Sequence, residues 1–510
     1  MERLMFDSEV WQRLVSLLEY DASAPMTLTT GFFLLAFTLF SFGYMAVRHR
    51  VGLRNIYVVL FSLYFYYKLS GSYVLLLLAV ALSDYLIGRG VARCRERGRG
   101  VRGLVALSVT IDVAILLYFK ATDFFVDVVN NLYAEGTLDW ESVVVPAGVS
   151  FFLFQSIAYV VDVARGTIQP LRRFVDYIFL LSFFPKMFLG PLVKAREFIP
   201  QIEERNVAVT RDDFGRAVTL IVGGLLKYAI IAKALGMLFV APAFDGDLGD
   251  GGLVALMAIY GFTLQIYCDF SGYSDIAVGI ALLMGFRLPD NFDAPYKSAT
   301  ITEFWRRWHI SLSTWLKEYL YISLGGNRKG RMHTYLNLVL TMFLGGLWHG
   351  VGITFIAWGV LHGVALALHK VWLEVVPGAK RLGSEMKLLW RIPAVLLTFH
   401  IVAFGWLLFT AENMGVVEDM LWRISANFSL EEICPLVQSS GVAMVLMAVG
   451  YVMHALPKGF DMGMQRMVTR LGFVGQCLLV VAMIWAVVQC DAMLAAECGA
   501  GGGLPMYAAF

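Results

Sequence analysis

Long apolar stretches recur along the whole chain, and short polar segments between them carry most of the charge. Several stretches are shorter than the about 20 residues with which a helix crosses a bilayer, so some are expected to be tilted, paired or re-entrant. The pattern predicts an all-helical membrane protein with about eleven to thirteen embedded segments. They are expected at residues 27–47, 56–69, 73–87, 104–118, 143–161, 174–188, 217–241, 253–284, 336–347, 353–373, 392–409, 442–453 and 473–488.

The composition supports the same class of protein. Hydrophobic residues make up 58% of the 510 residues and charged residues only 16%, whereas a soluble domain carries about 25% charged residues. No repeat of fixed period and no Pro- or Ser-rich linker divides the chain. We therefore expect a polytopic membrane protein with a single membrane-embedded domain over residues 1–510.

The placement of arginines orients the predicted segments. Arg48, Arg50 and Arg54 follow the first segment, and six further arginines between positions 89 and 102 follow the third. Cytoplasmic loops carry an excess of Lys and Arg, so both loops are expected in the cytoplasm. Residues 122–141 are acidic and contain no Lys or Arg, which indicates a loop on the opposite side.

Basic loops on the cytoplasmic side should alternate with acidic loops on the opposite side. This alternation fails if the segment at 174–188 crosses the bilayer completely. The acidic loop at 244–252 would then lie in the cytoplasm. A re-entrant segment that breaks at 184–185 and 190–191 removes the conflict. Irregular backbone at membrane depth is tolerated where protein or water surrounds it, so residues 185–191 are expected to line a cavity. A kinked ordinary span is the alternative.

His349 is the first candidate for chemistry. It lies in a mostly apolar run at 336–368 that glycines interrupt. An imidazole at membrane depth costs free energy unless it faces protein or water, so it is a functional candidate by default. The alternative is a histidine that packs between helices and bonds a neighbouring carbonyl group.

The middle of the chain carries the densest polar pattern. Asp269 and Asp275 lie within a long apolar segment, where a carboxylate must be paired, protonated or hydrated. We expect both to fix helix packing. Tryptophans and leucines then recur at helical spacing over residues 302–321, which predicts one amphipathic helix in the membrane interface with Thr302 as its cap. A basic, Gly-rich turn at 325–331 follows.

The six cysteines show no CxxC pair and no metal-ligand spacing with histidine. We interpret them as small apolar residues, and we expect neither a disulfide framework nor a metal site.

Several strings, taken together, resemble the membrane-bound O-acyltransferase (MBOAT) family, and most closely its bacterial branch with the membrane subunit of alginate O-acetylation. The strings are PAGVSFFLFQS at 146–156, FPKMFLGP at 184–191, YCDFSGYSD at 267–275, LPDNFDAPYK at 288–297, FWRRWHISLSTWLKEYLY at 304–321 and GGLWHG at 345–350. The resemblance runs in register over residues 143–368. The end of the chain, residues 504–510, departs from the more aromatic end of that branch.

The resemblance implies a helical bundle around a central funnel and gives the two histidines roles. His349 matches the family's membrane histidine, which implies a general base for attack of a hydroxyl on an acyl thioester, or a group that positions the acyl chain. His309 matches a second family position, which implies binding of the acceptor or orientation of the donor. His333, His362 and His369 have no motif and are expected to be structural. Residues expected to line the funnel or bind substrates are Trp305, Arg306, Arg307, Asn327, Trp348 and Asp269.

The same resemblance implies acyl transfer, with acetyl as the expected group, from a cytoplasmic thioester to hydroxyls of an extracytoplasmic polysaccharide. The donor is expected to be acetyl-CoA or an acyl carrier thioester, with no tightly bound cofactor. Arg306, Arg307, Arg328 and Lys329 are candidates to attract its phosphates, or serve only as cytoplasmic retention charges. The chain has no serine nucleophile motif followed by Asp and His, so an exported SGNH-type partner is expected. The expected location is the bacterial cytoplasmic membrane, without nucleic-acid binding.

Two other functions remain open at this point. One is a different MBOAT activity, either D-alanyl transfer to teichoic acid or protein acylation. The other is a non-catalytic transporter or flippase, in which His349 would relay protons and broken helices would form the substrate path.

Overall fold

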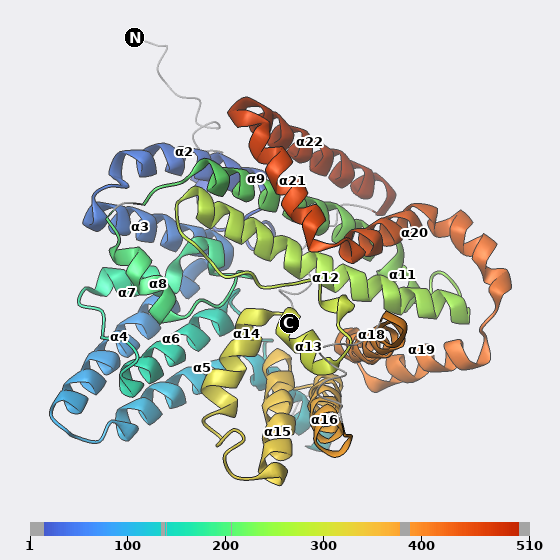
Figure 1. Cartoon of the computed structure of the whole chain (residues 1–510), viewed down its shortest axis with the longest axis horizontal. Helices are drawn as coiled ribbons and strands as arrows, with labels where there is room; N and C mark the ends of the chain where they lie inside the picture. Colours follow the sequence, from blue (N-terminus) through green and yellow to red (C-terminus); the bar gives the residue numbers. More distant parts are fainter. Residues whose placement is uncertain (1–14, 134–137, 139, 206, 378–387, 499–510) are drawn as a thin grey trace.

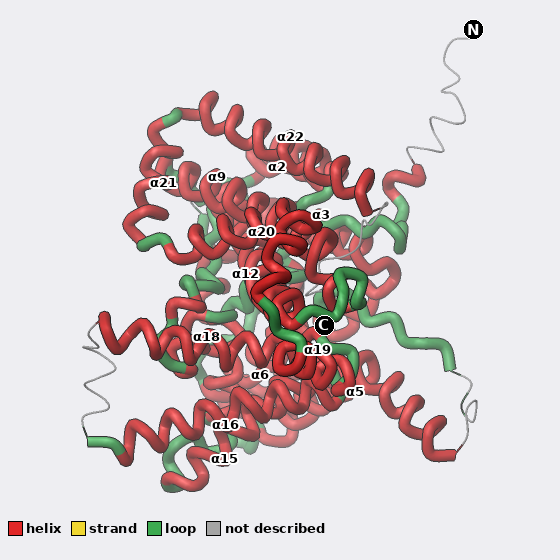
Figure 2. Tube along the Cα trace, turned by 90° about the vertical axis from the view of Figure 1, so that its right-hand side faces the viewer, coloured by secondary structure: helices red, strands yellow, loops and turns green. Residues whose placement is uncertain are grey.

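The computed structural model of the chain describes residues 15–133, 138, 140–205, 207–377 and 388–498. Within these ranges the regular structure is entirely helical, as the sequence predicts (Figure 2). Eight helical segments of the described part are long and apolar enough to cross a membrane. They are Val51–Glu96, Arg102–Tyr133, Arg211–Phe244, Gly252–Leu283, Ile353–Val375, Leu389–Thr410, Leu430–Ala455 and Gly472–Cys498.

The central element is α12 (Gly252–Leu283), which is buried along most of its length. It crosses the middle of the molecule in Figure 1, with α9 (Arg211–Leu225), α21 (Lys458–Arg470) and α22 (Gly472–Cys498) on one side and the helices of residues 301–375 on the other. Gly224 of α9 and Gly272 of α12 face each other: a Cβ atom built on either would lie within 2.7 Å of the other's carbonyl oxygen. These glycines allow the two backbones to approach closely.

The N-terminal part forms a group of helices beside α12. A threonine cap begins the first of them, since the Thr30 side chain accepts from Phe33 N. One prediction is wrong here. Residues 122–141 were expected to form a loop, but the helix that begins at Arg102 continues to Tyr133. The helices are α2 (Gly31–Val47), α3 (Val51–Ser70), α4 (Val74–Glu96), α5 (Arg102–Tyr133) and α6 (Val149–Arg165).

Residues 174–203 enter the bundle and turn back. α7 (Phe174–Ser182) has 9 residues, about 13 Å of helix, and cannot cross the about 30 Å apolar core of a bilayer. Near its start, Asp176 accepts from Asn55 Nδ2 at 2.9 Å. Near the end of α8 (Ala195–Glu203), Ile202 O accepts from Arg54 Nη2 at 2.5 Å. Because Arg54 and Asn55 are neighbours on α3, the segment leaves and returns at the same end of α3, which is the geometry of a re-entrant segment.

The chain between α9 and α12 contains two π-helical stretches, η3 (Leu226–Ala232) and η4 (Gly236–Val240). They flank the short α10 (Lys233–Leu235), and α11 (Ala241–Phe244) follows. Wide turns of this kind occur mostly at functional sites.

The single interfacial helix expected at 302–321 is wrong. The chain forms α13 (Ile301–Arg307), breaks at Trp308 and His309, and continues as α14 (Ile310–Trp315) and the π-helical η6 (Leu316–Tyr321). Of the apolar residues at helical spacing, Trp305, Trp308 and Leu312 are buried in the protein and Trp315 is half-buried. The expected cap is also wrong, since Thr300 and not Thr302 accepts from Glu303 N.

α15 (Arg331–His349) and α16 (Ile353–Val375) form a tight antiparallel hairpin. A Cβ atom on Gly346 would meet Phe355 O and lie 3.2 Å from Gly359 Cα, so the small residues set the helix separation. The remaining helices are α18 (Leu388–Thr410), α19 (Met414–Ala426) and α20 (Ile433–Ala455), followed by α21 and α22.

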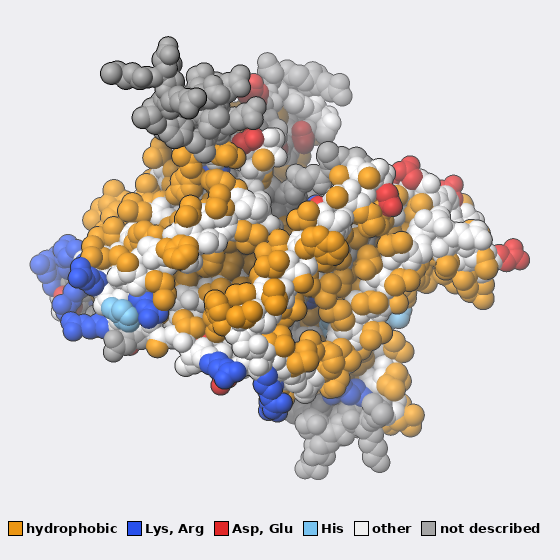
Figure 3. All heavy atoms as spheres, turned by 90° about the horizontal axis from the view of Figure 1, so that it is seen from above, with side chains coloured by type: hydrophobic (Ala, Val, Ile, Leu, Met, Phe, Trp, Pro, Cys, Tyr) orange, Lys and Arg blue, Asp and Glu red, His pale blue; other side chains and the backbone are white. Residues whose placement is uncertain are grey.

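The charged side chains separate toward opposite ends of the bundle, with an apolar band between them (Figure 3). We call one the basic end; there Arg95 Nη1 donates to Val163 O at 2.9 Å and Tyr85 donates to Arg172 O. We call the other the acidic end; there Asp250 and Asp419 pair with Arg423, and Glu432 accepts from Leu253 N at 3.1 Å. The division follows the alternation that the arginine pattern predicts.

Candidate active site

His349 is the last residue of α15, and the backbone becomes extended at Gly350. The helix of 19 residues rises about 28 Å from Arg331, so it carries the imidazole far from the basic turn at 325–331. The side chain is buried, with 6% exposed. Lys120 of α5 donates from Nζ to the carbonyl oxygen of His349 at 3.3 Å, which anchors the end of the helix.

Aromatic rings surround the His349 imidazole. The ring centroids of Trp358 and Phe409 lie 5.3 and 4.9 Å away, both edge-on, and the Trp348 ring lies at 4.4 Å. The indole N–H groups of Trp348 and Trp358 are buried without an acceptor among the described residues. Buried donors in a native protein normally have a partner, so these two N–H groups are available to a substrate.

His309 lies at the break between α13 and α14, with φ of 41°. A non-glycine residue in this left-handed conformation costs about 1–3 kcal/mol, and such residues cluster at functional sites. The side chain is 1% exposed. Phe270 of α12 packs edge-on against its ring at 4.6 Å. The fold therefore holds a buried imidazole in a strained turn.

A buried asparagine fixes this turn. Asn291 Oδ1 lies 3.1 Å from His309 Nδ1 and accepts from both the backbone N and the Oγ of Ser311, at 3.2 and 2.9 Å. The Asn291 carbonyl oxygen also accepts from Ile310 N at 2.9 Å. Asn291 thus accepts hydrogen bonds from backbone N–H groups in the first turn of α14, and it also contacts the imidazole of His309, which precedes that turn.

The fold brings the two histidines into one region. The Phe151 ring of α6 stacks at 6.4 Å on His309 and lies 6.5 Å from the Trp348 ring. The two imidazoles also interact electrostatically with each other. A second row of aromatic rings runs from Trp308, the neighbour of His309 in the chain, through Trp406 to Phe409, with successive ring separations of 4.6 and 5.6 Å.

The residues expected at the funnel mouth are only partly close to this region. Trp305 donates from Nε1 to His362 Nδ1 at 3.3 Å and packs against Trp358, which contacts His349. The expected structural role of His362 stays a prediction. Arg307 pairs with Glu303 at 2.8 Å, so its charge is already balanced.

Arg306 and Asn327 are exposed. Within the described part of the chain, neither residue makes a hydrogen bond, ion pair or ring contact with His309 or His349. Their expected role at the mouth stays a prediction.

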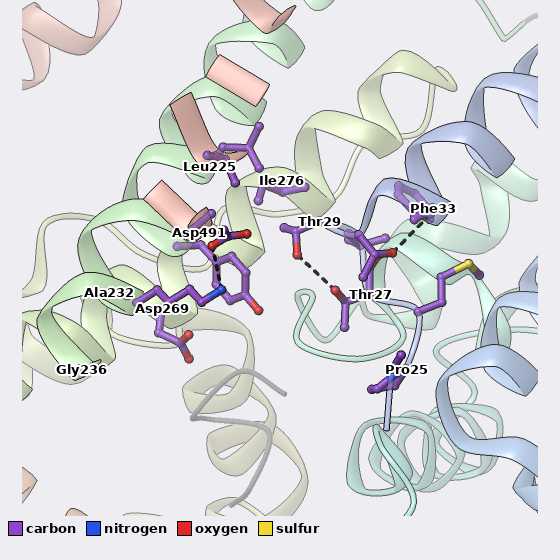
Figure 4. Close-up of a pocket in the computed structure, with 18 of the residues that line it drawn as sticks. Pro25, Thr27, Thr29, Phe33, Leu225, Ala232, Gly236, Asp269, Ile276 and Asp491 are labelled. Carbon is purple, nitrogen blue, oxygen red and sulfur yellow. Dashed lines mark hydrogen bonds and ion pairs between the residues drawn. The ribbon is translucent and has the colours of Figure 1, made fainter. Parts of the chain in front are cut away.

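Asp269 lines a cavity of about 1420 Å³ enclosed by α2, the stretch from η3 to η4, α12 and α22 (Figure 4). Lys233 and Asp491 form an ion pair of 2.7 Å across its wall. Its lining reaches Glu412 at the acidic end and Ile280 deep along α12. The lining includes neither candidate histidine. Because Asp269 faces the cavity and the next residue packs on His309, α12 separates the cavity from that imidazole.

The other carboxylate of α12 has a structural partner. Asp275 accepts from Lys227 Nζ at 2.5 Å, and the same ammonium group donates to Ser271 at 3.1 Å. The expectation that Asp275 fixes packing is confirmed.

All six cysteines carry free thiols. Among the described residues, no group of three or more His, Cys, Asp and Glu side chains is placed to bind a metal.

Sequence reasoning missed two polar residues of the site. Lys120 follows the predicted segment 104–118 directly, and a lysine at the edge of an apolar run is a detectable signal. Asn291 lies in the LPDNFDAPYK string, but nothing in its local pattern indicates that it contacts a residue 18 positions later.

Comparison with known proteins decides the family. Residues 160–405 match the family model of MBOAT, the membrane-bound O-acyltransferase family. The probable alginate O-acetylase AlgI of Pseudomonas putida is 40% identical over 372 residues, which cover 72% of this chain and 74% of the relative. The chain belongs to the membrane-bound O-acyltransferase family. It is thus a multi-pass membrane protein and an O-acyltransferase, and the alternative of a non-catalytic transporter is wrong.

Two further relatives show the range of named activities in the family. The peptidoglycan O-acetyltransferase of Helicobacter pylori is 34% identical over 385 residues, covering 71% of each chain. The teichoic acid D-alanyltransferase of Bacillus subtilis is 29% identical over 285 residues, covering 52% of this chain and 68% of the relative.

Proposed function

We propose that this MBOAT enzyme transfers an acetyl group from a cytoplasmic thioester to hydroxyl groups of an extracytoplasmic polysaccharide. The observation that carries the proposal is the buried His349, held at the end of α15 by Lys120 and surrounded by aromatic rings. The names of the relatives support the substrate class, since they include alginate O-acetylases and a peptidoglycan O-acetyltransferase.

His349 acts as the general base. Its imidazole takes the proton of the acceptor hydroxyl, and the hydroxyl oxygen attacks the thioester carbonyl carbon. The new C–O bond forms, the C–S bond breaks, and the imidazolium returns the proton to the leaving thiolate. Imidazole suits both transfers, because its unperturbed pKa lies near the working pH. The buried indole N–H groups of Trp348 and Trp358 offer hydrogen bonds to the acyl oxygen.

The basic end of the bundle faces the cytoplasm and receives the donor, which is acetyl-CoA or an acyl carrier thioester. The excess of Lys and Arg at that end supports this orientation, and Arg306, exposed near the site, offers a charge to the donor phosphates. The membrane is the bacterial cytoplasmic membrane, where a thioester made inside can reach a polymer outside.

The acceptor approaches the two histidines from the acidic end of the bundle, opposite to the donor. The chain carries no serine nucleophile motif followed by Asp and His, so an exported SGNH-type partner completes the transfer to the polymer. Asp269 lies within the cavity beside α12, and its expected role in lining the substrate funnel stays a prediction.

The decisive experiment replaces His349 by alanine in the native bacterium and measures O-acetyl groups on its surface polysaccharides. Loss of a general base lowers the rate by about 10²–10⁴, so acetylation should disappear while the protein still accumulates in the membrane. His400→Ala is the matched control, since His400 is an exposed histidine bonded to Tyr260, and should leave acetylation unchanged. Normal acetylation in the His349→Ala strain would remove the central claim.

His309 serves substrate binding and not the chemical step. We expect His309→Ala to raise KM with kcat nearly kept, and His349→Ala to lower kcat and kcat/KM together. The measurement uses permeabilised cells with radiolabelled acetyl-CoA. Identical kinetic changes in the two variants would mean that the histidines act as one unit.

D-alanyl transfer is the second candidate. The similarity to the teichoic acid D-alanyltransferase covers only 52% of this chain, compared with 72% for the alginate O-acetylase, so acetyl transfer is favoured. The mass of the group released from the polymer by mild base distinguishes acetate from D-alanine.

A further inference from the structure

Asn291 is buried at the end of the loop that follows α12 and is bonded through both ends of its side-chain amide. At one end, Nδ2 donates to Ser274 Oγ at 3.2 Å. At the other, Oδ1 faces His309 Nδ1 and two donors of Ser311. This arrangement determines which nitrogen of the imidazole carries the proton.

The orientation of the amide follows from groups whose roles are fixed. The backbone N–H of Ser311 is always a donor, so the atom 3.2 Å from it must be an acceptor. That atom is Oδ1 of Asn291; a flipped amide would place two donors against each other. Ser311 Oγ accepts from Leu192 N at 3.0 Å, so its own hydrogen points to Asn291 Oδ1.

The tautomer of His309 follows from the same contact. An oxygen that only accepts requires Nδ1 of His309 to be the donor. A neutral imidazole that carries its proton on Nδ1 has a lone pair on Nε2. Nε2 is buried without a hydrogen-bond partner among the described residues. The rings that pack on His309 are those of Phe151, Phe270 and Phe292, and a phenylalanine side chain has no hydrogen-bond donor.

We infer that Asn291 is a positioning residue that holds His309 in the Nδ1–H tautomer, so that Nε2 accepts a hydrogen bond from a hydroxyl group of the acceptor. The inference rests on the proposed function and narrows the role of His309. With a lone pair on Nε2, His309 has no N–H for the acyl carbonyl of the donor. It binds the hydroxyl substrate and leaves the proton transfer to His349.

The re-entrant segment supports this arrangement. Ser274, which accepts from Asn291, donates to Leu189 O at 3.2 Å, and Ser311 accepts from Leu192 N. The two bonds join the turn at Gly190 and Pro191 to the asparagine from both sides. The reversal of the chain at 183–194 thereby sets the position of the His309 ring.

Three substitutions test the inference in permeabilised cells of the native bacterium, with radiolabelled acetyl-CoA as donor and acyl-free alginate oligosaccharide as acceptor probe. Asn291→Leu removes the acceptor for Nδ1. We expect KM for the oligosaccharide to rise at least about tenfold, the factor for about 1.4 kcal/mol of lost binding, and KM for acetyl-CoA to change less than about twofold. Thr263→Ala is the control, since it removes a buried side-chain bond of α12, to Ile259 O at 2.8 Å, that involves neither Asn291 nor the imidazole, and it should leave both KM values near wild type.

Asn291→Asp keeps the acceptor oxygen and should retain most of the activity. A carboxylate beside Nδ1 stabilises the imidazolium, so a higher pH is needed to free Nε2. The acid limb of kcat/KM should therefore move to higher pH, which a purely structural asparagine would not cause. His349 is the titratable group that interacts electrostatically with His309, and it is unchanged in this variant.

The outcomes separate this inference from the proposed function. If wild-type cells transfer no acetyl group, the proposed function fails. If wild-type cells are active and Asn291→Leu has the kinetics of Thr263→Ala, or raises KM for acetyl-CoA equally, Asn291 does not position His309 for the acceptor. If Asn291→Leu does not accumulate, the pH profile of Asn291→Asp decides, and an unmoved acid limb refutes the inference.

Discussion

The close contact between α15 and α16 makes Gly346 a sensitive position. A Cβ atom there would meet the backbone oxygen of Phe355 and lie 3.2 and 3.3 Å from Gly359 Cα and N. Backbone atoms cannot rotate away, so Gly346→Ala must push the two helices apart. Gly345 is the matched control on the same helix, because its Cβ atom would meet only Leu316 Cδ1 at 3.7 Å, an ordinary contact.

The expected magnitudes follow from two opposing effects. Overpacking costs about 1–3 kcal/mol, and replacing glycine by alanine inside a helix gains about 0.5–1 kcal/mol. Gly345→Ala should be neutral or stabilising by up to about 1 kcal/mol. Gly346→Ala has the same stabilisation from alanine in a helix, but it also has the full cost of overpacking. The two variants should therefore differ by about 1–3 kcal/mol in the free energy of unfolding.

The effect on transfer should be larger than the effect on stability. His349 lies three residues after Gly346, and a displacement of a catalytic group by about 1 Å costs about 10²-fold in rate. Thermal unfolding of both purified variants in detergent, together with acetyl transfer from radiolabelled acetyl-CoA, measures the two effects. Equal unfolding midpoints and equal transfer rates for Gly345→Ala and Gly346→Ala would refute the packing argument.

Two further predictions concern orientation and a helix cap. In a cysteine-free background, a cysteine at Gly98 should react with a membrane-impermeant reagent only from the cytoplasm, because arginines cluster around that position. A cysteine at Asp247 should react only from outside, because acidic residues surround it. The reverse result would place the donor at the wrong end of the bundle. Thr210→Ala removes the capping box with Asp213 and should lower the free energy of unfolding by about 1 kcal/mol without changing acetyl transfer. Thr219→Ala, inside the same helix, is the control. An equal loss of stability in Thr219→Ala would show that the cap itself contributes little.

Local pattern was sufficient for most of the fold. Each of the predicted apolar segments contains a helix, because the need to satisfy backbone N–H and C=O groups inside a bilayer leaves helix as the solution for an apolar stretch. The boundaries were less accurate. The helix at 102–133 continues well beyond the predicted end at 118, because polar residues that find partners, such as Lys120 and Asp123, are tolerated in a helix and do not end it.

The stretch at 302–321 shows where the pattern fails. The spacing of Trp305, Trp308, Leu312 and Trp315 fits one continuous helix, but the backbone breaks at His309. The break is stable because Asn291, from a different loop, satisfies the backbone and side chain of Ser311. No local propensity encodes that contact, since the partner lies 20 positions away.

The sequence alone determined the class of the protein, its family resemblance and the identity of both candidate histidines, because apolar length, charge placement and motif strings are local properties. Tertiary structure alone decided what surrounds each imidazole. It placed Lys120 on the carbonyl of His349, Asn291 on Nδ1 of His309, and α12 between His309 and the cavity of Asp269. These contacts join residues that are far apart in the chain, and they exist because close packing of the whole bundle brings separate elements together.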